Sequence, residues 1–238
     1  MSELSIVFGL SLLAGAAMPL GALFAKFDFR SPAILGTEWR HFIVAFGGGA
    51  LISAIALVLV PEGTKEVTLL PAIVCFSAGG VCFCLLDIVL SRCKNSMSQM
   101  VAMLSDFIPE AMALGAAFAL GKSTGLLIAL LIVLQNIPEG FNAFEEISSS
   151  SKTPPNKIIL VFSLLAFVGP ASALTGFYFL SDFEMLMGII MLFASGGILY
   201  LVFEDVAPQA RLKNHWMPAL GAVFGFVLGL AGRMMVSA

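Results

Sequence analysis

The sequence predicts an all-α membrane protein with eight transmembrane helices, and three observations support this prediction. Of the 238 residues, 59% are hydrophobic and only 11% are charged, whereas soluble domains usually carry about 25% charged residues. Apolar runs of about 20 residues, long enough to cross a hydrocarbon core, recur along the whole chain. They are rich in Leu, Ala, Gly and Phe and lack the alternation of barrel strands, which favours helices.

The eight predicted spans follow one another through short connections. They cover residues 4–25, 41–60, 68–90, 99–120, 124–144, 158–180, 184–203 and 216–236. The longest polar stretch, about 147–157, contains four serines and two prolines and is expected to be a flexible cytoplasmic loop. We therefore expect a single transmembrane domain over residues 1–238, without a soluble domain.

The distribution of cations predicts how the chain is oriented. The first span is preceded by Met1, Ser2 and Glu3, without the positive charge of a signal peptide. If the N-terminus lies outside, nine of the 12 Lys and Arg residues fall on the cytoplasmic side. These are Lys26, Arg30, Arg40, Arg92, Lys94, Lys152, Lys157, Arg211 and Lys213, against Lys65, Lys122 and Arg233 outside. Eight spans then place the C-terminus outside as well.

The most informative feature is a set of polar side chains inside two consecutive spans. Span four contains Asp106 and Glu110, and span five contains Gln135, Asn136 and Glu139. A charge near the bilayer centre costs between about 2.5 and 17 kcal/mol, so such groups face the protein interior and mark substrate paths. The i, i+4 spacing places Asp106 and Glu110 on one helix face, and Gln135 and Glu139 likewise.

Three carboxylates in one dry place require protons or a cation to neutralise them. A divalent cation with several oxygen ligands is the simplest solution. Pro109 and Pro138 strengthen this interpretation, because a proline inside a helix frees the carbonyl four residues earlier, here at Ser105 and Leu134. The alternative is that these polar groups only hold the two helices together by hydrogen bonds.

The same residues carry a family resemblance. The stretch at 135–140, Gln-Asn-Ile-Pro-Glu-Gly, resembles the His-Asn-x-Pro-Glu-Gly signature of the ZIP (Zrt/Irt-like) metal transporters, and 106–111 resembles the companion signature on the preceding helix. The resemblance covers essentially the whole chain and implies a metal site midway across the membrane, transport toward the cytoplasm and an elevator-type motion. The metal ligands that it implies are Asp106, Glu110, Gln135, Asn136 and Glu139.

The chain departs from the family pattern at four positions. Asp106 and Gln135 stand where the family usually has histidines, although some bacterial members also have glutamine at the second position. Phe107 replaces an asparagine, and Gly169 stands where a glutamate often adds a ligand. These departures predict one metal ion in the site and not an adjacent pair. Carboxylate and carboxamide ligands favour manganese or iron(II), while zinc remains compatible through carboxylates.

Two further acids are candidates for the ion path. Glu62 follows Pro61 at the outer end of span two and is placed to collect cations there. Glu204, near the cytoplasmic end of span seven, is a candidate ligand on the exit path, or an interfacial carboxylate near Arg211.

A weak internal repeat links spans two and seven. Residues 46–61, a Gly-rich run ending in Val-Pro, resemble residues 193–208, which end in Ala-Pro. The two spans run in opposite directions in the predicted topology, as inverted-repeat transporters require. The similarity is short and Gly-rich, so chance resemblance remains an alternative.

The sequence thus predicts a transporter of a divalent transition metal and not an enzyme. One alternative is a ZIP-like protein that binds metal as a sensor or interaction partner without transporting it. A membrane-embedded metalloenzyme is disfavoured, because the chain has no His-Glu-x-x-His motif. The expected partners are the metal ion, as substrate, and the lipid bilayer, with no organic cofactor and no nucleic acid. A homodimer is left open, and the compact loops favour a prokaryotic cytoplasmic (inner) membrane.

Overall fold

The computed structural model describes residues 3–30, 37–92, 98–119, 124–180 and 182–237, and all regular structure in these ranges is helical. The elements are α1 (Glu3–Arg30), α2 (Thr37–Ala54), η1 (Ile55–Leu59), α3 (Val60–Gly63), α4 (Leu69–Arg92), α5 (Ser98–Ala119), α6 (Thr124–Ser150), α7 (Pro155–Leu165), α8 (Val168–Thr175), η2 (Gly176–Leu180), α9 (Glu184–Leu201), η3 (Val202–Val206), α10 (Ala207–Ala210) and α11 (Met217–Ser237). The cations Lys94 and Lys122 of the orientation argument lie outside the described residues.

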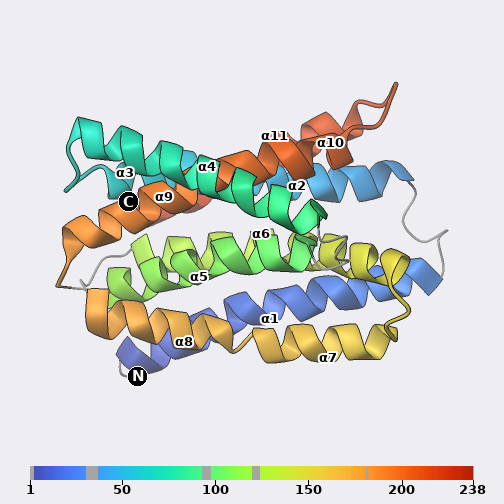
Figure 1. The fold of residues 1–238 in the computed structure, drawn as a ribbon, viewed down its shortest axis with the longest axis horizontal. Coiled ribbons are helices and arrows are strands. Elements are labelled where there is room, and N and C mark those ends of the chain that lie inside the picture. Colours follow the sequence, from blue (N-terminus) through green and yellow to red (C-terminus); the bar gives the residue numbers. More distant parts are fainter. Residues whose placement is uncertain (1–2, 31–36, 93–97, 120–123, 181, 238) are drawn as a thin grey trace.

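Seven of the helical segments in the described ranges are long and apolar enough to cross a membrane. Helix α5, which carries Asp106 and Glu110, is not one of the seven, so the predicted total of eight spans remains a prediction. The start of α1 and the end of α11 lie at the same end of the molecule (Figure 1). The end of α1, the connection from α6 to α7 and the connection from α10 to α11 lie toward the opposite end.

The helices form two groups, which Figure 1 shows as two layers. In the first, α1 packs against α6, α7 and α8, and α5 packs against α6 and α8; we call this the α5–α6 group. In the second, α2 packs against α11, and α9 packs against α3 and α4; we call this the α2–α9 group. The groups meet mainly where α2 packs on α6 and α5 packs on α9. The polar residues predicted to bind metal are all in the α5–α6 group.

The two helix pairs of the α2–α9 group pack in the same way. A Cβ added to Gly225 of α11 would lie 2.0 Å from the carbonyl oxygen of Phe46 in α2. A Cβ added to Gly79 of α4 would lie 1.9 Å from the carbonyl oxygen of Phe193 in α9. Glycine is therefore needed in both pairs for backbones to approach this closely. Phe46 and Phe193 are also the matched first residues of the two similar segments.

Those two segments are built from the same succession of elements. The α-helices α2 and α9 are each 18 residues long, each continues into a five-residue π-helix, and each ends in a four-residue α-helix. Pro61 and Pro208 occupy the second position of the short final helices. A proline clashes with the carbonyl four residues earlier, and the wider π turn relieves that clash. The two segments run in opposite directions (Figure 1).

Two predicted boundaries differ from the structure. Helix α6 continues to Ser150, so the connection predicted at about 147–157 is limited to residues 151–154, with Pro154 directly before α7. No helix-breaking residue precedes Pro154 in this stretch, and three serine hydroxyls bond back to the helix backbone. The span predicted at 158–180 lies within one segment, Pro155–Leu180, that is long and apolar enough to cross a membrane and consists of α7, α8 and η2. Within it α7 ends before α8 begins, because Pro170 cannot donate a backbone hydrogen bond to Ala166.

Candidate metal site

The predicted ligands lie at the buried contact between α5 and α6. Asp106 and Glu110 of α5 are each 2% exposed. Gln135 and Asn136 of α6 are 1% and 0% exposed, and both carboxylate oxygens of Glu139 are fully shielded from solvent. The structure therefore buries four of the five residues and the carboxylate oxygens of the fifth, Glu139, as the cost of placing polar groups in lipid requires.

Contacts between the two helices bring several of these groups together. The Nε2 of Gln135 donates a short hydrogen bond to Oε2 of Glu110, which links α6 to α5. Asp106 lies within electrostatic range of Glu110, and Glu139 lies within range of both. No cationic side chain contacts these three carboxylates in the described part of the chain. The site therefore concentrates negative charge without an internal counter-charge.

In the part of the chain that the structure describes, several oxygens in this region are buried and accept no hydrogen bond. They are Oδ1 of Asp106, Oε1 of Gln135, Oδ1 of Asn136, and both Oε1 and Oε2 of Glu139. Buried polar atoms in folded proteins almost always have a partner, so five orphaned acceptors in one region require an explanation. All five are oxygens with lone pairs to donate. Such a set suits a hard or borderline divalent cation.

Asn136 is fixed by a third helix. Its Nδ2 donates a hydrogen bond of 2.9 Å to the carbonyl oxygen of Ala14 in α1. Because the amide nitrogen is engaged, the amide plane is oriented and Oδ1 is left as the free acceptor. Helix α1 thus positions a potential ligand oxygen, although it contributes no charged group itself.

The two departures at Phe107 and Gly169 are neighbours in space. Phe107 is fully buried, and a Cβ added to Gly169 of α8 would lie 2.7 Å from Cζ of its ring. The ring therefore occupies the space that a side chain at position 169 would need. The same Cβ would also lie 2.6 Å from the backbone oxygen of Ser11 in α1, so the ring and this backbone together leave no room for a side chain at 169.

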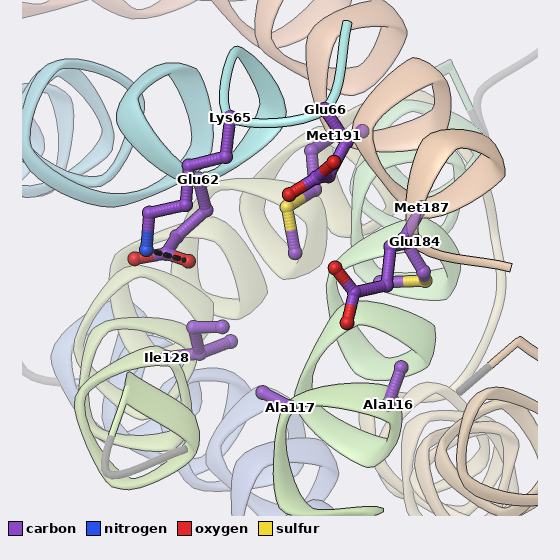
Figure 2. A pocket seen from close by; sticks show the side chains of 10 residues that line it. Glu62, Lys65, Glu66, Ala116, Ala117, Ile128, Glu184, Met187 and Met191 are labelled. Atoms are coloured by element: carbon purple, nitrogen blue, oxygen red, sulfur yellow. Dashed lines mark hydrogen bonds and ion pairs between the residues drawn. The ribbon is translucent and has the colours of Figure 1, made fainter. Parts of the chain in front are cut away.

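A small pocket lies between the two helix groups (Figure 2). Its volume is about 40 Å³, and its lining includes Glu62, Glu66 and Glu184. Ala117 and Ile128, also in the lining, lie seven residues from Glu110 and Gln135, or about 10 Å along each helix.

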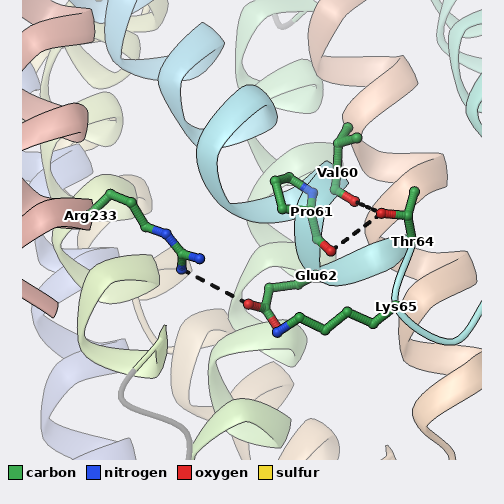
Figure 3. A network of polar contacts seen from close by, with 6 residues as sticks. All are labelled: Val60, Pro61, Glu62, Thr64, Lys65 and Arg233. Carbon is green, nitrogen blue, oxygen red and sulfur yellow. Dashed lines mark hydrogen bonds and ion pairs between the residues drawn. The ribbon is translucent and has the colours of Figure 1, made fainter. Parts of the chain in front are cut away.

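The path candidate Glu62 already has cationic partners. Its Oε2 accepts a hydrogen bond of 2.7 Å from Nζ of Lys65, and its Oε1 lies 4.0 Å from Nη1 of Arg233 (Figure 3). Its side chain is 6% exposed. The structure therefore places Glu62 at a pocket, as an acid whose charge is balanced by two neighbours.

The other path candidate, Glu204, is exposed on η3. It lies within electrostatic range of Asp205, which also senses Asp87 of α4 and Glu146 of α6. Acids from three elements therefore gather at the end of the molecule assigned to the cytoplasm.

In the described residues, no three His, Cys, Asp or Glu side chains converge closely enough to hold a metal ion. Any ion at α5 and α6 therefore requires amide oxygens or a rearrangement of the carboxylates.

Sequence reasoning missed one charged contact between the groups. Arg40 of α2 forms an ion pair with Glu145 of α6. The predicted span five ends at residue 144, which leaves Glu145 outside the helix. The length of the helical pattern beyond Glu139, uninterrupted by Gly or Pro after Gly140, is the signal that could have included it.

Comparison with known proteins supports a relationship to metal transporters. No family model matches the chain. The chain is 25% identical over 134 residues to a mouse (Mus musculus) protein named zinc transporter SLC39A7, an alignment that covers 54% of this chain and 28% of that protein. The chain thus spans little more than a quarter of the length of this curated relative.

Proposed function

We propose that this protein is a ZIP-like transporter that moves a divalent transition metal ion across a membrane toward the cytoplasm. The substrate binds between α5 and α6 through Asp106, Glu110, Gln135, Asn136 and Glu139. The similarity to a protein named as a zinc transporter supports this assignment. The apolar helices support a membrane location, which we propose to be a prokaryotic inner membrane.

The single observation that carries the proposal is the set of five buried, unpartnered oxygens on α5 and α6. A site that only glued helices together would pair these oxygens with donors, since an unmet buried acceptor costs about 1–3 kcal/mol. A divalent cation satisfies several such acceptors at once and neutralises the clustered carboxylates. Binding requires Glu110 to turn from Gln135 toward the ion, or Gln135 to offer its own free Oε1.

The arrangement of helices supports transport by relative motion of two bodies. The α5–α6 group holds all the proposed ligands, and the α2–α9 group contains the matched segments α2–η1–α3 and α9–η3–α10. Matched segments of opposite direction favour an inverted repeat, and the even number of crossings that it needs agrees with termini at one end. We propose eight spans with both termini outside and an elevator-type movement of the α5–α6 group.

We further propose that one ion binds at a time. The Phe107 ring fills the space beside Gly169, the position at which the family resemblance would add a further ligand. The ligand set contains no histidine, and this chemistry favours manganese or iron(II) relative to a histidine site, with zinc still accepted.

The decisive test is metal flux into liposomes that contain the purified protein. Zinc, iron(II), manganese, cadmium and magnesium are compared side by side, for the native protein and for Glu139→Gln. Glu3→Gln, which changes an exposed glutamate at the start of α1, serves as the matched control. The proposal expects saturable flux of transition metals that Glu139→Gln abolishes and Glu3→Gln preserves.

Two other outcomes separate the alternatives. Metal binding in calorimetry without flux, from folded protein, supports a ZIP-like sensor and rejects the transporter. Flux that Glu139→Gln leaves unchanged rejects the site on α5 and α6.

A further inference from the structure

The contact between α2 and α6 joins the two helix groups next to the candidate site. A Cβ added to Gly47 of α2 would lie 2.6 Å from Cγ of Pro138 in α6. Pro138 directly precedes Glu139, so the backbone of α2 touches the helix turn that presents a proposed ligand. This contact is close and apolar, and it involves a ring and a bare backbone with no interlocking side chain.

A charged contact lies further along the same two helices. The guanidinium of Arg40 in α2 forms an ion pair with Glu145 of α6, and its Cζ lies 5.8 Å from the centre of the Phe141 ring. Phe141 and Glu145 are one turn apart and share one face of α6. Arg40 therefore contacts one face of α6 through two side chains, those of Phe141 and Glu145.

These contacts form one continuous seam. On α2, Arg40, Val44 and Gly47 are spaced by four and three residues, and on α6 Pro138, Phe141 and Glu145 are spaced by three and four. Because α6 is one unbroken helix from Thr124 to Ser150, Glu139 and Glu145 move together. A displacement of α6 along α2 large enough to move the site must therefore separate Glu145 from Arg40.

We propose that the Arg40–Glu145 pair is a latch that closes the α2–α6 seam at its cytoplasmic end and opens when the site delivers its ion. The inference rests on the proposed transport function and adds a gating contact to it. The exposure of the two side chains suits this role: at 34% and 33% they are open enough for water to replace the pair. The Phe141 ring gives Arg40 a second contact on the same face of α6, which adds to the ion pair in the closed state.

The test measures access to the seam with a reporter thiol. Val44, 8% exposed, lies between Arg40 and Gly47 on the seam face of α2. In a variant whose four native cysteines are replaced by serine, Val44→Cys is labelled with a membrane-impermeant thiol reagent from the side where α2 begins. Labelling rates are compared for four backgrounds: the native pair, Glu145→Gln, Arg40→Gln, and the exchange Arg40→Glu with Glu145→Arg.

The latch predicts that each single change raises the labelling rate about two- to fivefold, the shift in an equilibrium that a partly exposed ion pair can produce. The exchanged pair restores slow labelling, because it rebuilds the attraction with reversed sign. Lys26→Gln is the matched control, since it breaks an exposed contact of 2.7 Å with Asn156 that joins α1 to α7 inside one helix group. This control leaves the labelling rate unchanged.

Unchanged labelling in both single variants overturns the latch, as does an exchanged pair that labels as fast as the single variants. A fluorescence-detected elution profile like that of the native protein shows that each variant is folded. Metal flux, measured on the same preparations, separates the two proposals. If the native protein transports metal but neither single variant changes the labelling rate, the proposed function stands and the latch is rejected. If the labelling rates follow the expected pattern but the native protein shows no flux, the proposed function alone is rejected.

Discussion

The chain contains the pattern Pro-Glu-Gly twice, once in α3 and once in α6, and the two glutamates have opposite electrostatic surroundings. Glu62 in α3 is held by Lys65 at 2.7 Å and faces Arg233 at 4.0 Å. Within the described residues, the shielded carboxylate of Glu139 in α6 accepts no hydrogen bond and lies within electrostatic range of two further acids, Asp106 and Glu110. The same local sequence thus yields a neutralised carboxylate in one helix and an unsatisfied one in the other.

The difference comes from which helices pack around each turn. Lys65 follows Glu62 by three residues and Arg233 reaches it from α11, so the charge of Glu62 is balanced within the α2–α9 group. Around Glu139, the neighbouring helix α5 adds further acids. A carboxylate without a protein counter-charge is the one suited to an external cation.

The largest expected effect is on metal binding at Glu139, whose carboxylate has no neighbouring cation among the described residues, in contrast to Glu62. Glu139→Gln should weaken binding of the transported metal by about 100-fold or more, because breaking a buried charge pair costs about 3–5 kcal/mol. Isothermal titration of the detergent-solubilised protein with manganese and zinc measures this change. Binding of Glu139→Gln within a few-fold of the native protein would show that the orphaned oxygens of Glu139 do not face the ion.

The next largest effect is expected on the choice between metals, which depends on the uncharged proposed ligand Gln135. Gln135→His should raise the ratio of zinc to manganese affinity on the order of tenfold, since imidazole favours zinc over harder ions. It also removes the amide donor that holds Glu110. Competitive uptake of the two metals into proteoliposomes measures the ratio. An unchanged ratio would argue that Gln135 orients Glu110 and does not touch the ion.

The comparison also shows what the sequence could and could not predict. Long apolar runs predicted the helices, and i, i+4 spacing predicted which polar residues share a face, because both signals are local. The buried contact between Gln135 and Glu110 agrees with the prediction that α5 and α6 face each other. The ligand assignment itself stays a prediction until metal binding is measured.

Local sequence patterns could not predict contacts between residues that are far apart in the chain. Arg40 and Glu145 are 105 positions apart, and nothing in either neighbourhood specifies the pairing. The balanced charge of Glu62 depends equally on Arg233, which only the fold brings near. The division of the predicted span 158–180 required the interplay of Pro170 with Ala166, which a hydropathy pattern does not register.

A smaller effect is expected at the small pocket between the two helix groups, which Glu62 and Lys65 line. Lys65→Gln removes an exposed cation beside Glu62 and so makes the pocket more attractive to an approaching metal ion. The apparent KM for metal flux should fall by about twofold at low ionic strength and return toward the native value in high salt. A salt series of initial uptake rates tests this. A KM that rises would mean that Lys65 keeps the pocket open, and that its charge does not repel the substrate.

The smallest effect on metal flux is expected for Glu62→Gln. This variant tests whether the neutralised carboxylate of Glu62 is dispensable for transport. Since Lys65 and Arg233 already neutralise this carboxylate, its loss should change maximal flux by no more than about twofold. Initial rates over a range of metal concentrations, set beside those of Glu139→Gln, provide the measurement. Loss of flux as severe as for Glu139→Gln would mean that the two Pro-Glu-Gly turns act alike. Glu62 would then have to release its cations and bind the ion during transport, which makes neighbouring charge a poor guide to function in this protein.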